Sequence, residues 1–125
     1  MSKKKILIID DEAAFTNIVK LTLELSDDYE VCVESNPCSA LATARKFRPD
    51  IVLMDVIMPV MDGGELRTLF MAHPLLNRTP IIFLTAIVGQ NEVEDHNGVI
   101  GGSFYLAKPV NAADLIKAIQ EHIRS

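Results

Sequence analysis

Several kinds of residue that signal a particular chemistry are scarce in this sequence. Its 125 residues include no tryptophan, two cysteines and three histidines. Cys32 and Cys38 lack the spacing of a CxxC motif, and such a pair in a chain without an export signal is typical of free thiols. The histidines are too scattered to pair as zinc ligands. We therefore expect neither the cysteines nor the histidines to have a chemical role.

The chain also lacks an excess of positive charge and a long apolar run. Its formal net charge is −5, whereas a basic surface is needed to displace counterions from nucleic-acid phosphates. The lysines near its start precede too short an apolar stretch for a signal peptide, and no run is long enough to span a membrane. We expect a single cytoplasmic domain over residues 1–125, with no direct binding to nucleic acid or membranes.

What the sequence does contain is a regular alternation of two patterns. Apolar runs of about five residues are separated by longer segments with helical periodicity. This alternation predicts βα units around a parallel sheet. The expected fold class is therefore α/β, a flavodoxin-like doubly wound (βα)5 fold whose five-stranded parallel sheet has the order 2-1-3-4-5.

The helical segments differ in how clearly they can be placed. Asn36 and Asn111 are expected to be the N-caps of the second and last helices. Residues 87–102 are rich in glycine and acidic residues, so a short, mobile fourth helix is expected there. The inner face of the first helix is expected to contain Phe15, Ile18, Val19, Thr22 and Leu25.

Polar residues stand at the ends of four of the apolar runs. ILIIDD ends in Asp10 and Asp11, IVLMD in Asp55, IIFLT in Thr85, and SFYLAKP contains Lys108. The carboxyl ends of parallel strands share one edge of the sheet, where doubly wound folds bind their ligands. Taken singly, each residue has a structural explanation, such as a helix N-cap, a turn or a solvated charge. The combination on four strand ends favours a functional site.

The expected site has a charge problem that suggests its chemistry. Each pair of carboxylates about 4 Å apart costs on the order of 4 kcal/mol at an effective dielectric near 20. Lys108 supplies one positive charge, and a divalent ion would supply two. A site with only oxygen ligands suits Mg²⁺, which often bridges to a phosphoryl group. These features predict metal-assisted phosphoryl chemistry with Asp55 as the nucleophile.

The motifs IIDDE, LMDVIMPVMDG, FLTA and YLAKP, at these intervals, resemble the receiver domain of two-component response regulators. The resemblance covers nearly the whole chain. It implies that Asp55 accepts a phosphoryl group from a histidine kinase or a histidine phosphotransfer protein. It also implies that Mg²⁺, with Mn²⁺ as the alternative ion, is bound directly by Asp11, Asp55 and the backbone carbonyl of Ile57, and by Asp10 mainly through water.

The same resemblance implies a signalling switch rather than an enzyme. Lys108 would contact the phosphoryl group, Thr85 would turn its hydroxyl toward it, and Tyr105 would move inward. The surface formed by residues 87–102, the strand before Lys108 and the last helix would then bind a downstream protein or effector domain, or a second copy of the chain. A pseudo-receiver, which would act as an interaction module without phosphorylation, is the alternative function.

Two positions depart from the common pattern of the family. Ile57 and Ile87 flank the expected phosphate entrance where polar residues are frequent, and apolar side chains there would hinder an attacking water. We therefore hypothesise a long-lived aspartyl phosphate.

Ile57 also argues against a haloacid-dehalogenase-like phosphatase, which needs a second Asp two residues after Asp55. The acidic first loop likewise argues against a flavodoxin, whose first loop binds an anion.

Overall fold

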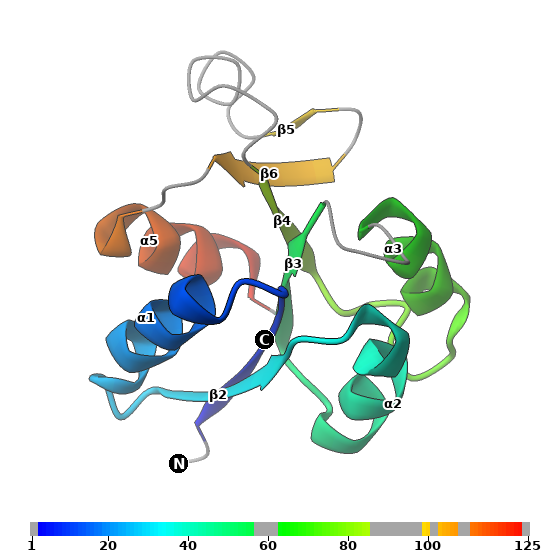
Figure 1. The fold of residues 1–125 in the computed structure, drawn as a ribbon, viewed down its shortest axis with the longest axis horizontal. Coiled ribbons are helices and arrows are strands. Elements are labelled where there is room, and N and C mark those ends of the chain that lie inside the picture. Colours follow the sequence, from blue (N-terminus) through cyan, green and yellow to red (C-terminus); the bar gives the residue numbers. More distant parts are fainter. Residues whose placement is uncertain (1–2, 57–62, 86–98, 101–102, 108–110, 124–125) are drawn as a thin grey trace.

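A computed structural model describes residues 3–56, 63–85, 99–100, 103–107 and 111–123 of the chain (Figure 1). Strands and helices alternate through most of this part. In chain order the elements are β1 (Lys4–Ile9), α1 (Ala13–Glu24), β2 (Tyr29–Glu34), α2 (Pro37–Phe47), β3 (Ile51–Asp55), α3 (Gly63–Ala72), β4 (Ile81–Thr85), β5 (Val99–Ile100), β6 (Ser103–Ala107) and α5 (Ala112–His122).

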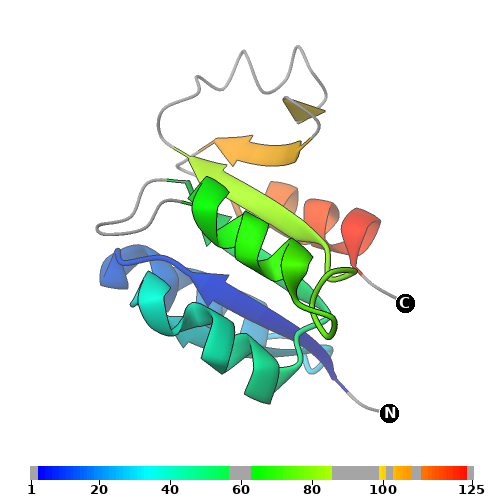
Figure 2. The ribbon, with the colours of Figure 1, turned by 90° about the vertical axis from the view of Figure 1, so that its right-hand side faces the viewer.

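The strands form one sheet in the order β2-β1-β3-β4-β6-β5. The pairs β1–β2, β1–β3, β3–β4 and β4–β6 are all parallel. The predicted parallel sheet of order 2-1-3-4-5 is therefore confirmed, with β6 as its fifth parallel strand. Its carboxyl ends lie together: in Figure 2 the arrowheads of β1, β4 and β6 point to the same side.

The short edge strand β5 was not predicted. Val99–Ile100 pairs antiparallel with β6, so this part of residues 87–102 is extended rather than helical. Residues 86–98, where most of the fourth helix was expected, lie outside the described part of the chain. The prediction failed at Val99 because a two-residue strand is determined by its pairing with β6 and has no periodicity of its own.

Helices cover both faces of the sheet and enclose two apolar cores. Figure 1 shows α1 and α5 on one face and α2 and α3 on the other. Ile6 and Ile8 of β1 contribute to the core under α1 and α5, whereas Leu7 and Ile9 contribute to the core under α2 and α3. A strand that is buried on both faces needs apolar residues at every position, which explains the unbroken run in β1.

The predicted N-caps of α2 and α5 are confirmed. The side-chain oxygen of Asn36 accepts a hydrogen bond from the Cys38 amide at 2.9 Å. The side-chain oxygen of Asn111 accepts one from the Asp114 amide at 2.8 Å. Each bond satisfies an amide that has no partner within its helix, so the chain direction is fixed where these helices begin.

The predicted inner face of α1 was partly wrong. Thr16, Val19 and Leu23 are buried, whereas Ile18 is 65% exposed and Leu25 is 87% exposed. Thr16 can be buried because its hydroxyl donates a hydrogen bond to the carbonyl oxygen of Ala13 at 3.1 Å. Phe15 and Val19 face the core as predicted, but the buried stripe runs through Thr16 and Leu23 instead of Ile18 and Leu25.

None of the helices in the described ranges is both long and apolar enough to cross a membrane.

Candidate functional site

The end of β1 places two acidic side chains at the carboxyl edge of the sheet. Asp10 is fully buried, and its amide donates a hydrogen bond to the carbonyl oxygen of Glu34 at 3.2 Å. Its carboxylate oxygen Oδ1 accepts a hydrogen bond from the Glu12 amide at 2.9 Å. This short loop closure is typical of Asp and fixes the orientation of the carboxylate. Asp11, by contrast, is exposed.

The end of β3 places a third acid beside them. Ile9 of β1 pairs with Met54 of β3, so Asp10 and Asp55 follow at neighbouring positions. The Val56 amide donates a hydrogen bond to the carbonyl oxygen of Leu84 at 3.1 Å, which continues the ladder to β4 beyond Asp55. Asp55 is 8% exposed, so it is buried but keeps a small accessible surface.

The three carboxylates form one cluster. One oxygen from each of Asp10, Asp11 and Asp55 lies within 4.8 Å of the others. At that distance and an effective dielectric near 20, the buried pair of Asp10 and Asp55 repels by roughly 3.5 kcal/mol. A divalent cation would offset this repulsion. Because all the ligand atoms are carboxylate oxygens, the cluster fits a hard ion such as Mg²⁺ better than Zn²⁺, which prefers nitrogen and sulfur.

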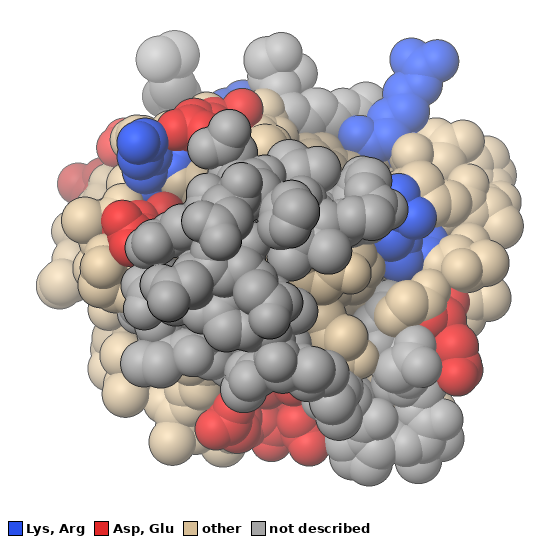
Figure 3. All heavy atoms as spheres, turned by 90° about the horizontal axis from the view of Figure 1, so that it is seen from above, with Lys and Arg blue, Asp and Glu red and all other residues tan. Residues whose placement is uncertain are grey.

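In the part of the chain that the structure describes, buried carboxylates occur in this cluster alone. Within the described ranges, the buried polar or charged residues are Asp10, Thr16, Asp55 and Thr79. Both buried acids thus belong to this cluster. Acidic side chains also gather at one margin of the surface in Figure 3, the margin that faces the viewer in Figure 1.

The other predicted site residues are less completely placed. Thr85 ends β4 and pairs with Ala107 of β6, so its backbone reaches the same edge of the sheet as Asp55. Ile57 and Lys108 lie outside the described part of the chain. The geometry therefore brings Asp10, Asp11 and Asp55 together and puts the end of β4 at the same edge.

Tyr105 lies away from the acidic cluster, in the core under α2 and α3. It is half-buried and pairs in register with Phe83 of β4. The two rings stack with centroids 5.2 Å apart and planes 28° apart. Phe83 was not among the predicted site residues. Its position opposite Tyr105 could have been found from the alignment of IIFLT with SFYLA on neighbouring strands.

Comparisons with known proteins agree with this geometry. Residues 6–120 match a family model described as the response regulator receiver domain. A probable transcriptional regulator from Pyropia yezoensis is 38% identical over 98% of this chain and 48% of the relative. The phosphate regulon transcriptional regulatory protein PhoB of Pseudomonas aeruginosa is 31% identical over 99% of this chain and 53% of the relative. The chain thus spans about half the length of these curated relatives.

Solved structures show the same similarity. Chemotaxis protein CheY4 of Vibrio cholerae has a TM-score of 0.82 and 32% identity, with 98% of this chain and 100% of the other covered. The receiver domain of sensor histidine kinase PA1611 from Pseudomonas aeruginosa has a TM-score of 0.80 and 29% identity, with 97% and 98% covered. In that structure a magnesium ion is coordinated in the active site cleft.

Proposed function

The chain belongs to the family of response regulator receiver domains, and we propose that it is a switch whose Asp55 accepts a phosphoryl group from a phosphohistidine. The observation that supports this most is the cluster of Asp10, Asp11 and Asp55 within 4.8 Å at the carboxyl edge of the sheet. We place this activity in the cytoplasm. The donor would be a histidine kinase or a histidine phosphotransfer protein.

The proposed transfer follows from the positions of the acids. An oxygen of Asp55 forms a bond to phosphorus while the bond from phosphorus to the imidazole nitrogen breaks, and that nitrogen keeps the electron pair. Asp10 is held by the Glu12 amide, so it can support a cation without reorienting. Asp10, Asp11, Asp55 and the carbonyl of Ile57 would hold Mg²⁺, or Mn²⁺ as the alternative. When bound, the ion would reduce the repulsion between these carboxylates and the incoming phosphoryl oxygens.

The proposed response involves the strands next to Asp55. Lys108 would pair with a phosphoryl oxygen, and the Thr85 hydroxyl would turn toward the same group. Tyr105 would report this change to the surface of β6, α5 and residues 87–102, where a downstream protein, an effector domain or a second copy of the chain would bind. Such a switch is a shift between two existing arrangements, driven by added negative charge.

A direct test uses acetyl phosphate and Mg²⁺ followed by intact mass measurement. The wild type should gain one phosphoryl group, and Asp55→Asn should gain none. Asp27→Asn, which removes an exposed acid from the turn after α1, should behave like the wild type. Chelating the metal should abolish the gain. A folded wild type that stays unmodified would contradict the proposal and favour the pseudo-receiver function.

The lifetime of the aspartyl phosphate is a separate part of the proposal. Ile57 and Ile87 would restrict the approach of water to the acyl phosphate on Asp55, so decay of the radiolabelled protein should be slow. Ile57→Asn should shorten the half-life. Decay within seconds in the wild type, or an unchanged half-life in Ile57→Asn, would refute this role for the two isoleucines.

A further inference from the structure

Strand β2 is an edge of the sheet, and no described strand pairs with its outer side. The Lys4 amide donates a hydrogen bond to the carbonyl oxygen of Asp28 at 2.9 Å, and the Asp10 amide donates one to that of Glu34 at 3.2 Å. Even-numbered residues of this segment therefore face β1 with their backbone groups. Backbone groups alternate in direction along a parallel strand, so the amides and carbonyls of Tyr29, Val31 and Val33 point away from β1. An edge of this kind can pair with another extended strand.

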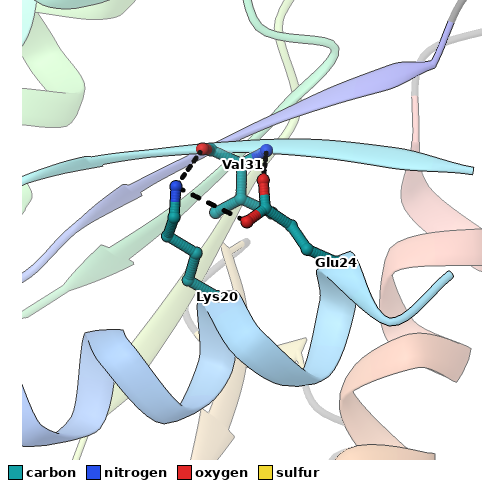
Figure 4. Close-up of polar contacts among 3 residues, drawn as sticks. All are labelled: Lys20, Glu24 and Val31. Atoms are coloured by element: carbon teal, nitrogen blue, oxygen red, sulfur yellow. Dashed lines mark hydrogen bonds and ion pairs between the residues drawn. The ribbon is translucent and has the colours of Figure 1, made fainter. Parts of the chain in front are cut away.

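Two side chains of α1 occupy both outward groups of Val31 (Figure 4). The Val31 amide donates a hydrogen bond to Oε2 of Glu24 at 3.3 Å. Nζ of Lys20 donates one to the carbonyl oxygen of Val31 at 3.3 Å. Lys20 and Glu24 also form an ion pair at 3.5 Å across one turn of the helix. Together they supply the acceptor and the donor that a neighbouring strand would supply.

The ion pair contributes little to stability by itself. The side chains of Lys20 and Glu24 are 43% and 36% exposed, and exposed pairs of this spacing are weak because water and salt screen them. The position of the two side chains over Val31 affects strand pairing more than it affects stability. A strand that paired with β2 would have to displace both charged groups from Val31 and leave them beside its own backbone.

The sequence of β2 is well suited to such unwanted pairing. Tyr29, Val31 and Val33 alternate with Glu30, Cys32 and Glu34, and β-branched and aromatic residues favour strands. In an antiparallel pair of two copies centred on Val31, Tyr29 would oppose Val33 and Glu30 would oppose Cys32. The apolar residues would then match on one face, while Glu34 would oppose Asp28 on the other, so a second copy fits this edge through the apolar face.

We propose that Lys20 and Glu24 act as an edge guard, which prevents β2 from pairing with β2 of a second copy of this chain. The guard acts at the opposite edge of the sheet from β6, so it is independent of the proposed phosphorylation surface. It also gives a reason for the placement of both charges over one residue of β2.

The test compares two double variants by sedimentation over a range of protein concentrations. Lys20→Ala/Glu24→Ala should associate at a concentration about tenfold lower than the wild type, which corresponds to about 1.4 kcal/mol. Asp27→Ala/Lys46→Ala removes one exposed charge of each sign without changing the groups that bond to Val31, and it should match the wild type. A folded guard variant with the mass of the wild type at every concentration overturns the proposal.

A third substitution tests the route of association. The backbone amide of Val33 points outward, so proline there removes an edge donor without removing a bond to β1. Val33→Pro added to Lys20→Ala/Glu24→Ala should restore the behaviour of the wild type. Association that persists in the triple variant also overturns the proposal, because it would then use another surface.

Hydrogen exchange provides a readout that does not depend on the double variant being folded. In Glu24→Ala alone, the Val31 amide should exchange about fivefold faster than in the wild type, because it loses its acceptor. Unchanged exchange at Val31 would overturn the proposal by showing that Glu24 does not cover this group. Far-UV circular dichroism of the same sample confirms that the single variant is folded.

Discussion

Replacing Asp10 with asparagine should have opposite effects on stability with and without a divalent cation. Asp10 and Asp55 are both buried and their oxygens lie within 4.8 Å, so their repulsion is roughly 3.5 kcal/mol at an effective dielectric near 20. The pair with the exposed Asp11 adds less, because water screens it. Asp10→Asn removes this repulsion but weakens the hydrogen bond from the Glu12 amide by about 1 kcal/mol. Without metal, the free energy of unfolding should rise by about 2.5 kcal/mol.

With the metal, the order of the two proteins should change. Mg²⁺ at 1,000 times its Kd should stabilise the wild type by about 4.1 kcal/mol. Asp10→Asn removes one negative charge from beside the ion, so the added stabilisation should be much smaller. The wild type should therefore gain more from Mg²⁺ than the variant does, even though it starts from a lower stability.

Urea unfolding followed by far-UV circular dichroism, in EDTA and in Mg²⁺, measures both effects. Asp27→Asn, on the exposed turn after α1, is the matched control and should leave both curves unchanged. If Asp10→Asn were less stable than the wild type in EDTA, relief of repulsion between the carboxylates would not be the main effect of the substitution. If Mg²⁺ stabilised both proteins equally, Asp10 would have no role in binding the ion.

Three further predictions concern other parts of the fold. Arg48 has a left-handed backbone with φ of 57° at the end of α2, so Arg48→Gly should raise the free energy of unfolding by about 0.5–1 kcal/mol. A lower free energy of unfolding in urea would refute this prediction. Phe83→Leu removes the ring that stacks on Tyr105 and should lower stability by about 1–3 kcal/mol while making Tyr105 more accessible to nitration; unchanged nitration would show that the stacking does not hold the ring. Burial, and secondarily Glu34, raises the pKa of the Cys32 thiol, so iodoacetamide should modify the exposed Cys38 first, and equal reaction rates of the two thiols would contradict this prediction. The stability linked to the raised pKa is present below the ordinary thiol pKa and is lost as pH rises through the raised pKa.

The strands and the acidic cluster were predictable for a common physical reason. A strand that is buried on both faces appears in the sequence as a continuous apolar run, and it ends where a polar residue reaches solvent. Parallel topology then forces the ends of such runs to the same edge. Asp10, Asp11 and Asp55 could therefore be grouped without knowledge of any side-chain contact.

Features that depend on contacts between elements were not predictable in this way. The buried face of α1 includes Thr16, whose hydroxyl is satisfied within the helix, so its burial could not be predicted from its polarity. Strand β5 pairs Val99 with Phe104 and Ile100 with Ser103, which leaves two residues between the paired segments. Those residues are a Gly-Gly pair in the sequence, a turn signal that a helical interpretation of residues 87–102 overlooks.

The burial of Asp10 and Asp55 is the strongest argument that this edge of the sheet has a function. Thr16, another buried polar residue of the described ranges, satisfies its hydroxyl with a nearby carbonyl at little electrostatic cost. Two buried carboxylates within 4.8 Å repel each other, and an apolar residue at either position would avoid that cost. Folded proteins tolerate such local conflicts mainly where a site needs them. The same repulsion would favour binding of a cation, so the expected gain in stability of Asp10→Asn without metal and the proposed binding of Mg²⁺ have one origin.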